Sequence, residues 1–179
     1  ECTRTFRLGM TDYASASFLP RILAELHIRA PSVRIVVQHV GRHQGAEAVS
    51  EGRVDLAMGN FLQQSNLRLH PLTLEKYVCA ISKDHSFVGE RMTLDDYLSF
   101  PHLLVASSGE EGGIVDFELS LRGIRREIIC TVPHFLVAPM LLEKTDIVLT
   151  LMEGVLRRSE EQYNLRLVDA PIEIPEYRS

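Results

Sequence analysis

Short polar and aromatic side chains follow several expected strands, and their types suit the binding of a small ligand. The first group is Thr11, Asp12 and Tyr13, directly after an alternating strand over residues 4–10. A hydroxyl and backbone N–H groups at a strand-to-helix junction can hold a polar or anionic ligand group. Alternatively, Thr11 is only a turn residue. Both interpretations fit the sequence about equally well.

A second group follows the expected strand over residues 102–106 and consists of Ser107 and Ser108 before Gly109. Clustered small residues ahead of a helix suit an anion-binding loop. The alternative is a surface loop, which Glu110 and Glu111 favour because carboxylates repel an anion. We expect a binding role for Ser107 and, less strongly, for Ser108.

His134 and Phe135 follow the expected strand over residues 128–132, at the start of an expected helix over residues 135–144. A histidine there can donate to a carboxylate, and a phenyl ring can pack on a ligand ring. The alternative is a helix cap beside a core phenylalanine. Thr150, with a hinge role as its alternative, and Phe61, with a surface loop as its alternative, complete the candidate ligand-binding residues.

Motifs that would indicate an enzyme or a metal site are missing. There is no G-x-S-x-G elbow, P-loop or His-Glu-x-x-His, and no Ser-His-Asp set can be assigned. His39 and His43 have i, i+4 spacing, but Gly41 lies between them at a strand end instead of on a helix. We therefore expect no catalytic residue, no cofactor and no metal.

The elements that must position these residues alternate between strands and helices, which predicts an α/β fold with parallel strand–helix–strand units. The first helix is expected to be capped by Ser15 or Ser17, with Pro20 in or near its first turn. Thr93 and Asp96 resemble a capping box. The remaining expected strands cover residues 33–40, 54–58, 67–74, 77–82, 147–151 and 165–168, and other expected helices cover residues 46–50, 113–122 and 152–160.

Two segments, residues 74–78 and 148–151, look like crossings between lobes. They predict two Rossmann-like lobes joined by two crossover strands. Lobe I would be discontinuous, with residues 1–77 and 150–179, and lobe II would hold residues 78–149. Two crossings are typical of hinged proteins that close on a ligand in the cleft.

The composition argues against some classes of function. The chain has 24 acidic and 19 basic residues and a net charge of −5, so we do not expect it to bind DNA by itself. The chain has three cysteines, Cys2, Cys79 and Cys130. Because their number is odd and no two have a C-x-x-C spacing, we expect free thiols in a reducing, cytoplasmic compartment. No membrane span or signal peptide is expected, and the first residue is Glu1, so we expect an upstream segment to be missing.

The order and spacing of several motifs resemble the effector-binding domain of LysR-type transcriptional regulators. The motifs are FRLGMTD at 6–12, FLPRIL at 18–23, APSV at 30–33, GRVDLAMG at 52–59, YVC at 77–79, KDH at 83–85, LRGIR at 121–125 and VPHF at 132–135. The Met-Thr-Asp and Val-Pro-His-Phe runs are similar to regulators of nodulation or of aromatic-compound degradation. The family's final helix and any Trp are missing, so we expect the chain to be truncated or its tail to be lacking.

This resemblance implies a fold like type II periplasmic binding proteins, a small-molecule effector in the interlobe cleft, and a homo-oligomer, dimeric for this domain. DNA would be bound only through a winged helix-turn-helix domain that the chain lacks. An effector-sensing domain without chemistry of its own is therefore the expected function. A solute-binding receptor of a transporter shares the fold and is the alternative; a helix-turn-helix upstream would distinguish the two. An enzyme on the same scaffold is the third and weakest reading.

Overall fold

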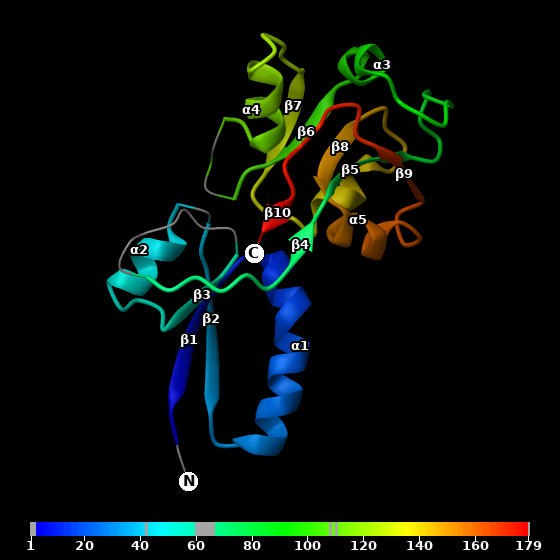
Figure 1. Cartoon of the computed structure of the whole chain (residues 1–179). Coiled ribbons are helices and arrows are strands. Elements are labelled where there is room, and N and C mark those ends of the chain that lie inside the picture. Colours follow the sequence, from blue (N-terminus) through cyan, green and yellow to red (C-terminus); the bar gives the residue numbers. More distant parts are fainter. Residues whose placement is uncertain (1–2, 42, 60–66, 108, 110, 179) are drawn as a thin grey trace. The chain divides into compact units, whose positions relative to one another are not determined.

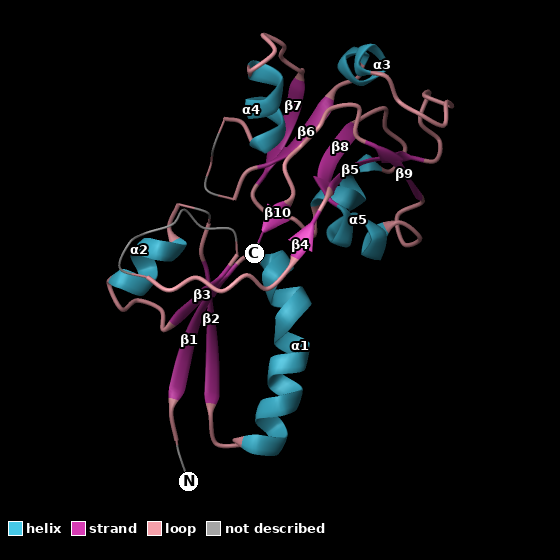
Figure 2. Ribbon diagram, viewed as in Figure 1, coloured by secondary structure: helices cyan, strands magenta, loops and turns pink. Residues whose placement is uncertain are grey.

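The computed structural model (Figure 1) describes residues 3–41, 43–59, 67–107, 109 and 111–178. The chain divides into two compact units, which we describe separately. The first comprises Glu1–Leu72 with Arg178–Ser179, and the second comprises Thr73–Tyr177. Both units combine helices with sheets (Figure 2). Among the described residues, no helix is long and apolar enough to cross a membrane.

The first unit is built on a three-stranded parallel sheet in the order β2-β1-β3. Strand β1 (Thr5–Met10) lies between β2 (Arg34–His39) and β3 (Leu56–Met58). Helix α1 (Asp12–Arg29) joins β1 to β2, and α2 (Gly45–Ser50) joins β2 to β3 on the opposite side of β1. The carboxyl end of β1 is therefore a topological switch point, where open α/β sheets bind ligands.

Helix α1 begins earlier than the sequence predicted. Its cap is Thr11, whose backbone is extended and whose hydroxyl accepts from the Ala14 N–H at 3.2 Å, so the prediction of a Ser15 or Ser17 cap was wrong. Pro20 consequently lies in the helix interior and not in the first turn. It contributes no N–H, and the carbonyl one turn earlier loses its helical partner. The helix packs on the sheet through a small core of Leu8, Met10 and Ala14.

The second unit contains a mixed five-stranded sheet in the order β7-β6-β8-β5-β9. Strand β6 (His102–Val105) is parallel to both neighbours, β7 (Ile128–Val132) and β8 (Val148–Met152). Strand β5 (Tyr77–Ser82) is antiparallel to β8 and to β9 (Leu165–Asp169), unlike the parallel units expected from the sequence. The helical segments are α3 (Leu94–Ser99), α4 (Ile114–Ser120), η1 (Ala138–Leu142) and α5 (Glu153–Ser159).

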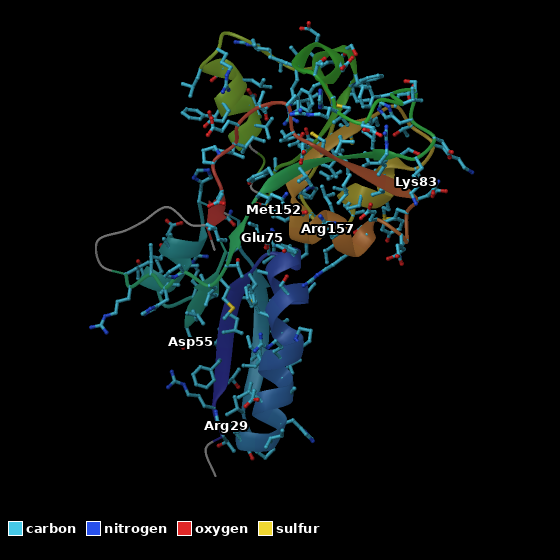
Figure 3. All side chains as sticks on the ribbon, turned by 45° about the vertical axis from the view of Figure 1, so that its right-hand side comes forward. Arg29, Asp55, Glu75, Lys83, Met152 and Arg157 are labelled. Carbon is cyan, nitrogen blue, oxygen red and sulfur yellow. The ribbon has the colours of Figure 1, made fainter. Side chains whose placement is uncertain are left out.

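Residues 150–177 fall in the second unit, which differs from the lobe boundaries expected from the sequence. The reason is pairing: β8 and β9 flank β5 and complete the second sheet. The start of α5 is also tied to β4 (Leu74–Glu75), because Glu75 accepts from the Gly154 N–H at 3.1 Å. Glu75 and Met152 are labelled in Figure 3. Strand β10 (Tyr177–Arg178) pairs with β4, and the second unit ends within β10, at Tyr177.

Two local features predicted from the sequence are present in the structure. The Thr93–Asp96 capping box is present, and Gly123 lies just beyond α4 at φ +70°. The expected strand over residues 67–74 is reduced to the two residues of β4. The expected helix over residues 135–144 is the short 3-10 helix η1, which contains Pro139. A proline removes one of the N–H donors that a longer helix needs.

The core of the second unit contains a directed chain of polar side chains. Arg126 Nη1 donates to the Tyr97 hydroxyl at 3.1 Å. Because a guanidinium can only donate, the Tyr97 proton must point elsewhere, toward Thr150 Oγ1 at 2.8 Å. Thr150 can then donate to Cys79 Sγ at 3.4 Å. Burial raises the pKa of Cys79 to about 11 and that of Tyr97 to about 12, so both stay neutral at physiological pH.

The thiols agree in part with the sequence prediction. Cys79 is free and buried, whereas Cys130 is free and only partly buried. Cys2 lies outside the described residues. With its raised pKa and no exposed surface, Cys79 behaves as a core residue and not as a reactive nucleophile.

Replacing Tyr97 by phenylalanine tests the polar chain. Tyr97→Phe removes one oxygen and leaves an Arg126 N–H and the Thr150 hydroxyl without their partner in the core. We expect the free energy of unfolding to fall by about 1–3 kcal/mol. Urea titration measures it. Tyr163→Phe is the matched control, since its hydroxyl accepts from the exposed Gln162 side chain at 3.0 Å, and it should change stability by less than about 0.5 kcal/mol. Equal effects would contradict the role of the buried chain.

We expect the protein to lose stability in mild acid because His102 is buried in its neutral form. Its ring is buried, and Nε2 lies 2.9 Å from the Tyr97 carbonyl oxygen, to which it must donate. Burial, and then the charge of Arg126, lower the pKa of His102 from 6.5 to about 4. The folded state thus resists protonation. The stabilisation is complete above pH 6.5 and is lost as the pH falls toward about 4.

The measurement is the free energy of unfolding in urea across that pH range. His85 also has a lowered pKa, mainly because of burial, so it adds to the slope in the same direction. His102→Gln isolates one contribution: its stability should depend less steeply on pH than that of the wild type. Identical slopes would show that His102 does not titrate in this way.

Candidate functional site

The first candidate group lies at the carboxyl end of β1, the switch point of the first unit. Thr11 is buried, and its carbonyl accepts from both the amide and the hydroxyl of Ser15, at 2.9 and 2.8 Å. The helix cap uses only an acceptor lone pair of the Thr11 hydroxyl, so that hydroxyl can still donate its proton. Asp12 and Tyr13 form the first turn of α1, with Tyr13 buried. Thr11 can therefore cap the helix and still donate a hydrogen bond to a ligand.

The second unit brings Ser107 and His134 to one edge of its sheet. Strands β6 and β7 are parallel with Val105 opposite Val132, and the Ala106 N–H donates to the Val132 carbonyl at 2.9 Å. The segments that follow, which carry Ser107 and His134, therefore leave the sheet side by side. Ser107 is half-buried and His134 is exposed. Ser107 and His134, which are 27 positions apart in the sequence, thus both follow paired strands at the same carboxyl edge.

This edge is also a switch point. From β6 the chain passes through α4 to β7 on one side, and then through η1 to β8 on the other side of β6. Figure 1 shows α4 beside β7 and β6. Phe135, partly buried, follows His134 ahead of η1. An aromatic ring, an imidazole and a hydroxyl at one edge can together hold a ring and an acidic group.

Other candidates lie elsewhere. Thr150 is in the middle of β8, opposite Cys79, and its hydroxyl is engaged by Tyr97. Thr150 is buried, so its position is that of a core residue of the second unit. Phe61 and Ser108 lie outside the described residues. In the part of the chain that the structure describes, no group of three or more His, Cys, Asp or Glu residues could hold a metal ion.

Arg126 and Asp116 were missed by the sequence analysis, since Arg126 looks like its neighbours Arg122 and Arg125 in the sequence. Arg122 and Arg125 are exposed, but Arg126 is only 9% exposed. Burial alone would raise the pKa of Asp116, yet the hydrogen bonds and charge of Arg126 lower it. The available signal was strand parity: Arg126 lies two residues before Ile128 and four before Cys130, on the inward-facing side of the chain.

Comparisons with known proteins agree with this geometry. A family model described as the LysR substrate binding domain matches residues 2–178. The chain is 33% identical over 180 residues to the HTH-type transcriptional activator NahR of Pseudomonas putida, covering 97% of this chain and 58% of that protein. It is 25% identical over 178 residues to Nodulation protein D 1 of Rhizobium leguminosarum bv. phaseoli, covering 97% and 56%. It thus spans a little over half the length of these relatives.

Solved structures are similar over nearly the whole chain. The probable transcriptional regulator PA0477 from Pseudomonas aeruginosa has a TM-score of 0.92 at 32% identity, covering 99% of this chain and 60% of that one. The effector binding domain of QuiR in complex with shikimate has a TM-score of 0.77 at 13% identity, covering 97% and 84%, a likeness of fold alone. The predicted α/β fold and the resemblance to nodulation regulators are confirmed. The chain belongs to the LysR substrate-binding domain family and has its periplasmic-binding-protein type II-like fold.

Proposed function

We propose that this chain is the effector-sensing part of a transcriptional regulator. It binds a small ligand and controls transcription through a DNA-binding domain that is not part of these 179 residues. The observation that carries the proposal is the position of the candidate polar groups at the switch points of both units, after β1 and after β6. The names of the relatives as transcriptional activators support it. A cytoplasmic, non-enzymatic role follows for a protein that acts on genes.

The side chains favour a small aromatic acid as the ligand. Tyr13 and Phe135 offer rings, and Thr11, Ser107 and His134 offer hydrogen-bond donors. Aromatic side chains with a few polar groups suit a planar ring that carries a carboxylate. The solved QuiR domain holds shikimate, a small ring acid, on the same fold. The transporter-receptor alternative receives no comparable support, since the matched family and the relatives named above are regulators.

The ligand proposal is tested with benzoate as the probe in isothermal titration calorimetry. His134→Ala should weaken binding by about 1.5–3 kcal/mol, the range for a hydrogen bond to a charged group. His27→Ala is the control, because His27 is exposed near the far end of α1.

Thermal unfolding gives a second readout. At about 100 times the Kd, benzoate should stabilise the wild type by about 2.7 kcal/mol. The apo His134→Ala protein should be as stable as the wild type, since His134 is exposed. Unchanged affinity in His134→Ala would remove that residue from the site, and unfolding of the variant would favour the structural cap.

We also propose that the domain forms a homodimer. Phe117 in α4 and Leu121 at its C-cap are 57% and 66% exposed and lie one helical turn apart, so they form an apolar strip. Helix α1 exposes Ile28 at 78% near its end. A second copy could cover these apolar side chains.

Sedimentation velocity across a concentration series tests the dimer. Ile28→Glu places a charge on the exposed apolar position of α1 and should raise the dimer dissociation constant by about tenfold or more, because 1.4 kcal/mol already corresponds to tenfold. Val88→Glu is the control, since Val88 is an equally exposed apolar residue, at 88%, on a loop of the second unit. A wild type that stays monomeric at hundreds of micromolar, or equal effects of both variants, would contradict the proposal.

A further inference from the structure

The loop that follows β5 is built around a buried histidine. The side chain of His85, in the KDH motif at 83–85, has no exposed surface, and its Nδ1 accepts from the Phe87 N–H at 2.9 Å. Because Nδ1 is an acceptor, the proton of the neutral ring lies on Nε2. Nε2 is buried and has no hydrogen-bond partner among the described residues. Lys83, at the start of the loop, is labelled in Figure 3.

Side chains from two other parts of the second unit hold this loop closed. The Ser86 N–H donates to Asp146 Oδ1 at 2.7 Å, two residues before β8. Arg166, in β9, donates from Nη1 to the Gly89 carbonyl at 2.8 Å and from Nη2 to the Phe87 carbonyl. The conformation of residues 85–89 is therefore set by hydrogen bonds of the imidazole, of a carboxylate and of a guanidinium.

The imidazole has two competing neighbours at the same nitrogen. Asp146 Oδ1 lies 3.8 Å from His85 Nδ1, whereas the Phe87 amide already donates to that nitrogen. The other charged group that acts on the ring is Arg166, and Phe100 packs against it with ring centroids 4.5 Å apart. Burial lowers the pKa of His85 from 6.5, and Asp146 opposes this shift. One protonation state cannot serve both neighbours, because the amide needs a lone pair and the carboxylate needs a proton.

The turn by itself does not require a histidine. Asparagine and aspartate side chains commonly accept from the backbone N–H two residues further on, in the way that His85 Nδ1 accepts from Phe87. What an imidazole adds is a charge that changes in the range of about pH 5 to 8. At this position that charge would appear on the atom that closes the loop.

We propose that residues 85–89 form a pH-sensitive latch. With a neutral His85 the Phe87 amide has its acceptor and the loop is closed. Protonation places a hydrogen on Nδ1, so the amide loses its acceptor and the imidazolium donates to Asp146 instead. The latch lies where β5 ends and β8 begins, at the end of the sheet opposite to the carboxyl end of β6. Protons would therefore act on this domain at a place separate from the candidate ligand edge.

Amide-resolved hydrogen exchange by NMR tests the latch in the whole 179-residue chain. After correction for the chemical effect of pH, amides of residues 86–89 should exchange about fivefold faster or more at about pH 5.5 than at about pH 7.5, relative to β5 and β8. The reason is that each pH unit below the ordinary histidine pKa of 6.5 favours the open loop by up to about tenfold. His102 stays mostly neutral in this range, because its pKa is about 4.

Three variants separate the contributions. His85→Asn keeps an acceptor for the Phe87 amide but takes up no proton, so its loop should exchange equally at both pH values. In Asp146→Asn the imidazolium loses its carboxylate acceptor, so the increase at about pH 5.5 should be smaller. His27→Asn is the matched control, because His27 is exposed in α1, and it should respond as the wild type does.

Several results would overturn the proposal. One is a wild-type loop whose exchange changes no more than that of β5 and β8, and another is a response in His85→Asn or in Asp146→Asn equal to that of the wild type. If a variant does not fold, the imidazole nitrogens of the wild type decide the question. The ring should carry its proton on Nε2 at neutral pH and gain the Nδ1 proton below pH 6.5, as the Phe87 amide loses protection. A ring that already carries the proton on Nδ1 at neutral pH would contradict the latch.

Discussion

The need to give hydrogen-bond partners to the three nitrogens of one buried guanidinium organises much of the second unit. Arg126 lies just before β7, and its partners come from α4 and α3. A buried cation without partners would cost several kcal/mol, so these segments must come together in one arrangement. Through Tyr97 the constraint extends to Thr150 in β8 and then to Cys79 in β5. Separate elements of the sheet and its covering helices thereby share one polar connection.

The two units share one arrangement at their candidate sites. In each unit a central strand, β1 or β6, has parallel neighbours on both sides, and the helices that follow diverge from its carboxyl end. Thr11 and Ser107 occupy these two equivalent places. In the first unit the helix cap itself holds Thr11 in position. In the second unit Ser107 lies two residues beyond β6, and Asp116 and Arg126 fix the residue before α4.

The sequence predicted features that depend on neighbouring residues. The strand over residues 5–10, the Thr93 capping box and the turn at Gly123 follow from alternation, side-chain caps and a positive φ. The sequence also predicted the strands that precede Ser107 and His134. Features set by distant pairing were missed. Nothing near residue 150 reveals that β8 pairs with β5, and so the lobe boundary expected there differs from the structural one.

Two local misjudgements have a similar cause. A Ser-rich start suggested a late cap for α1, but the extended backbone of Thr11 provides the earlier one and leaves Pro20 inside the helix. Three nearby arginines look alike in the sequence, although alternation along the approach to β7 separates the buried Arg126 from the exposed Arg125, and Arg122 lies in the turn after α4. Composition describes a segment as a whole, whereas burial depends on which face each residue occupies.

The fixed direction of the hydrogen bonds from Arg126 also limits how this domain can diverge during evolution. A guanidinium cannot accept, so the donor–acceptor order through Tyr97 and Thr150 cannot be reversed by a single substitution. Loss of Asp116 strands a charge, and loss of Arg126 strands a carboxylate, so each single step passes through a less stable intermediate. In descendants of this sequence these positions should therefore be inherited together or replaced together, as correlated substitutions.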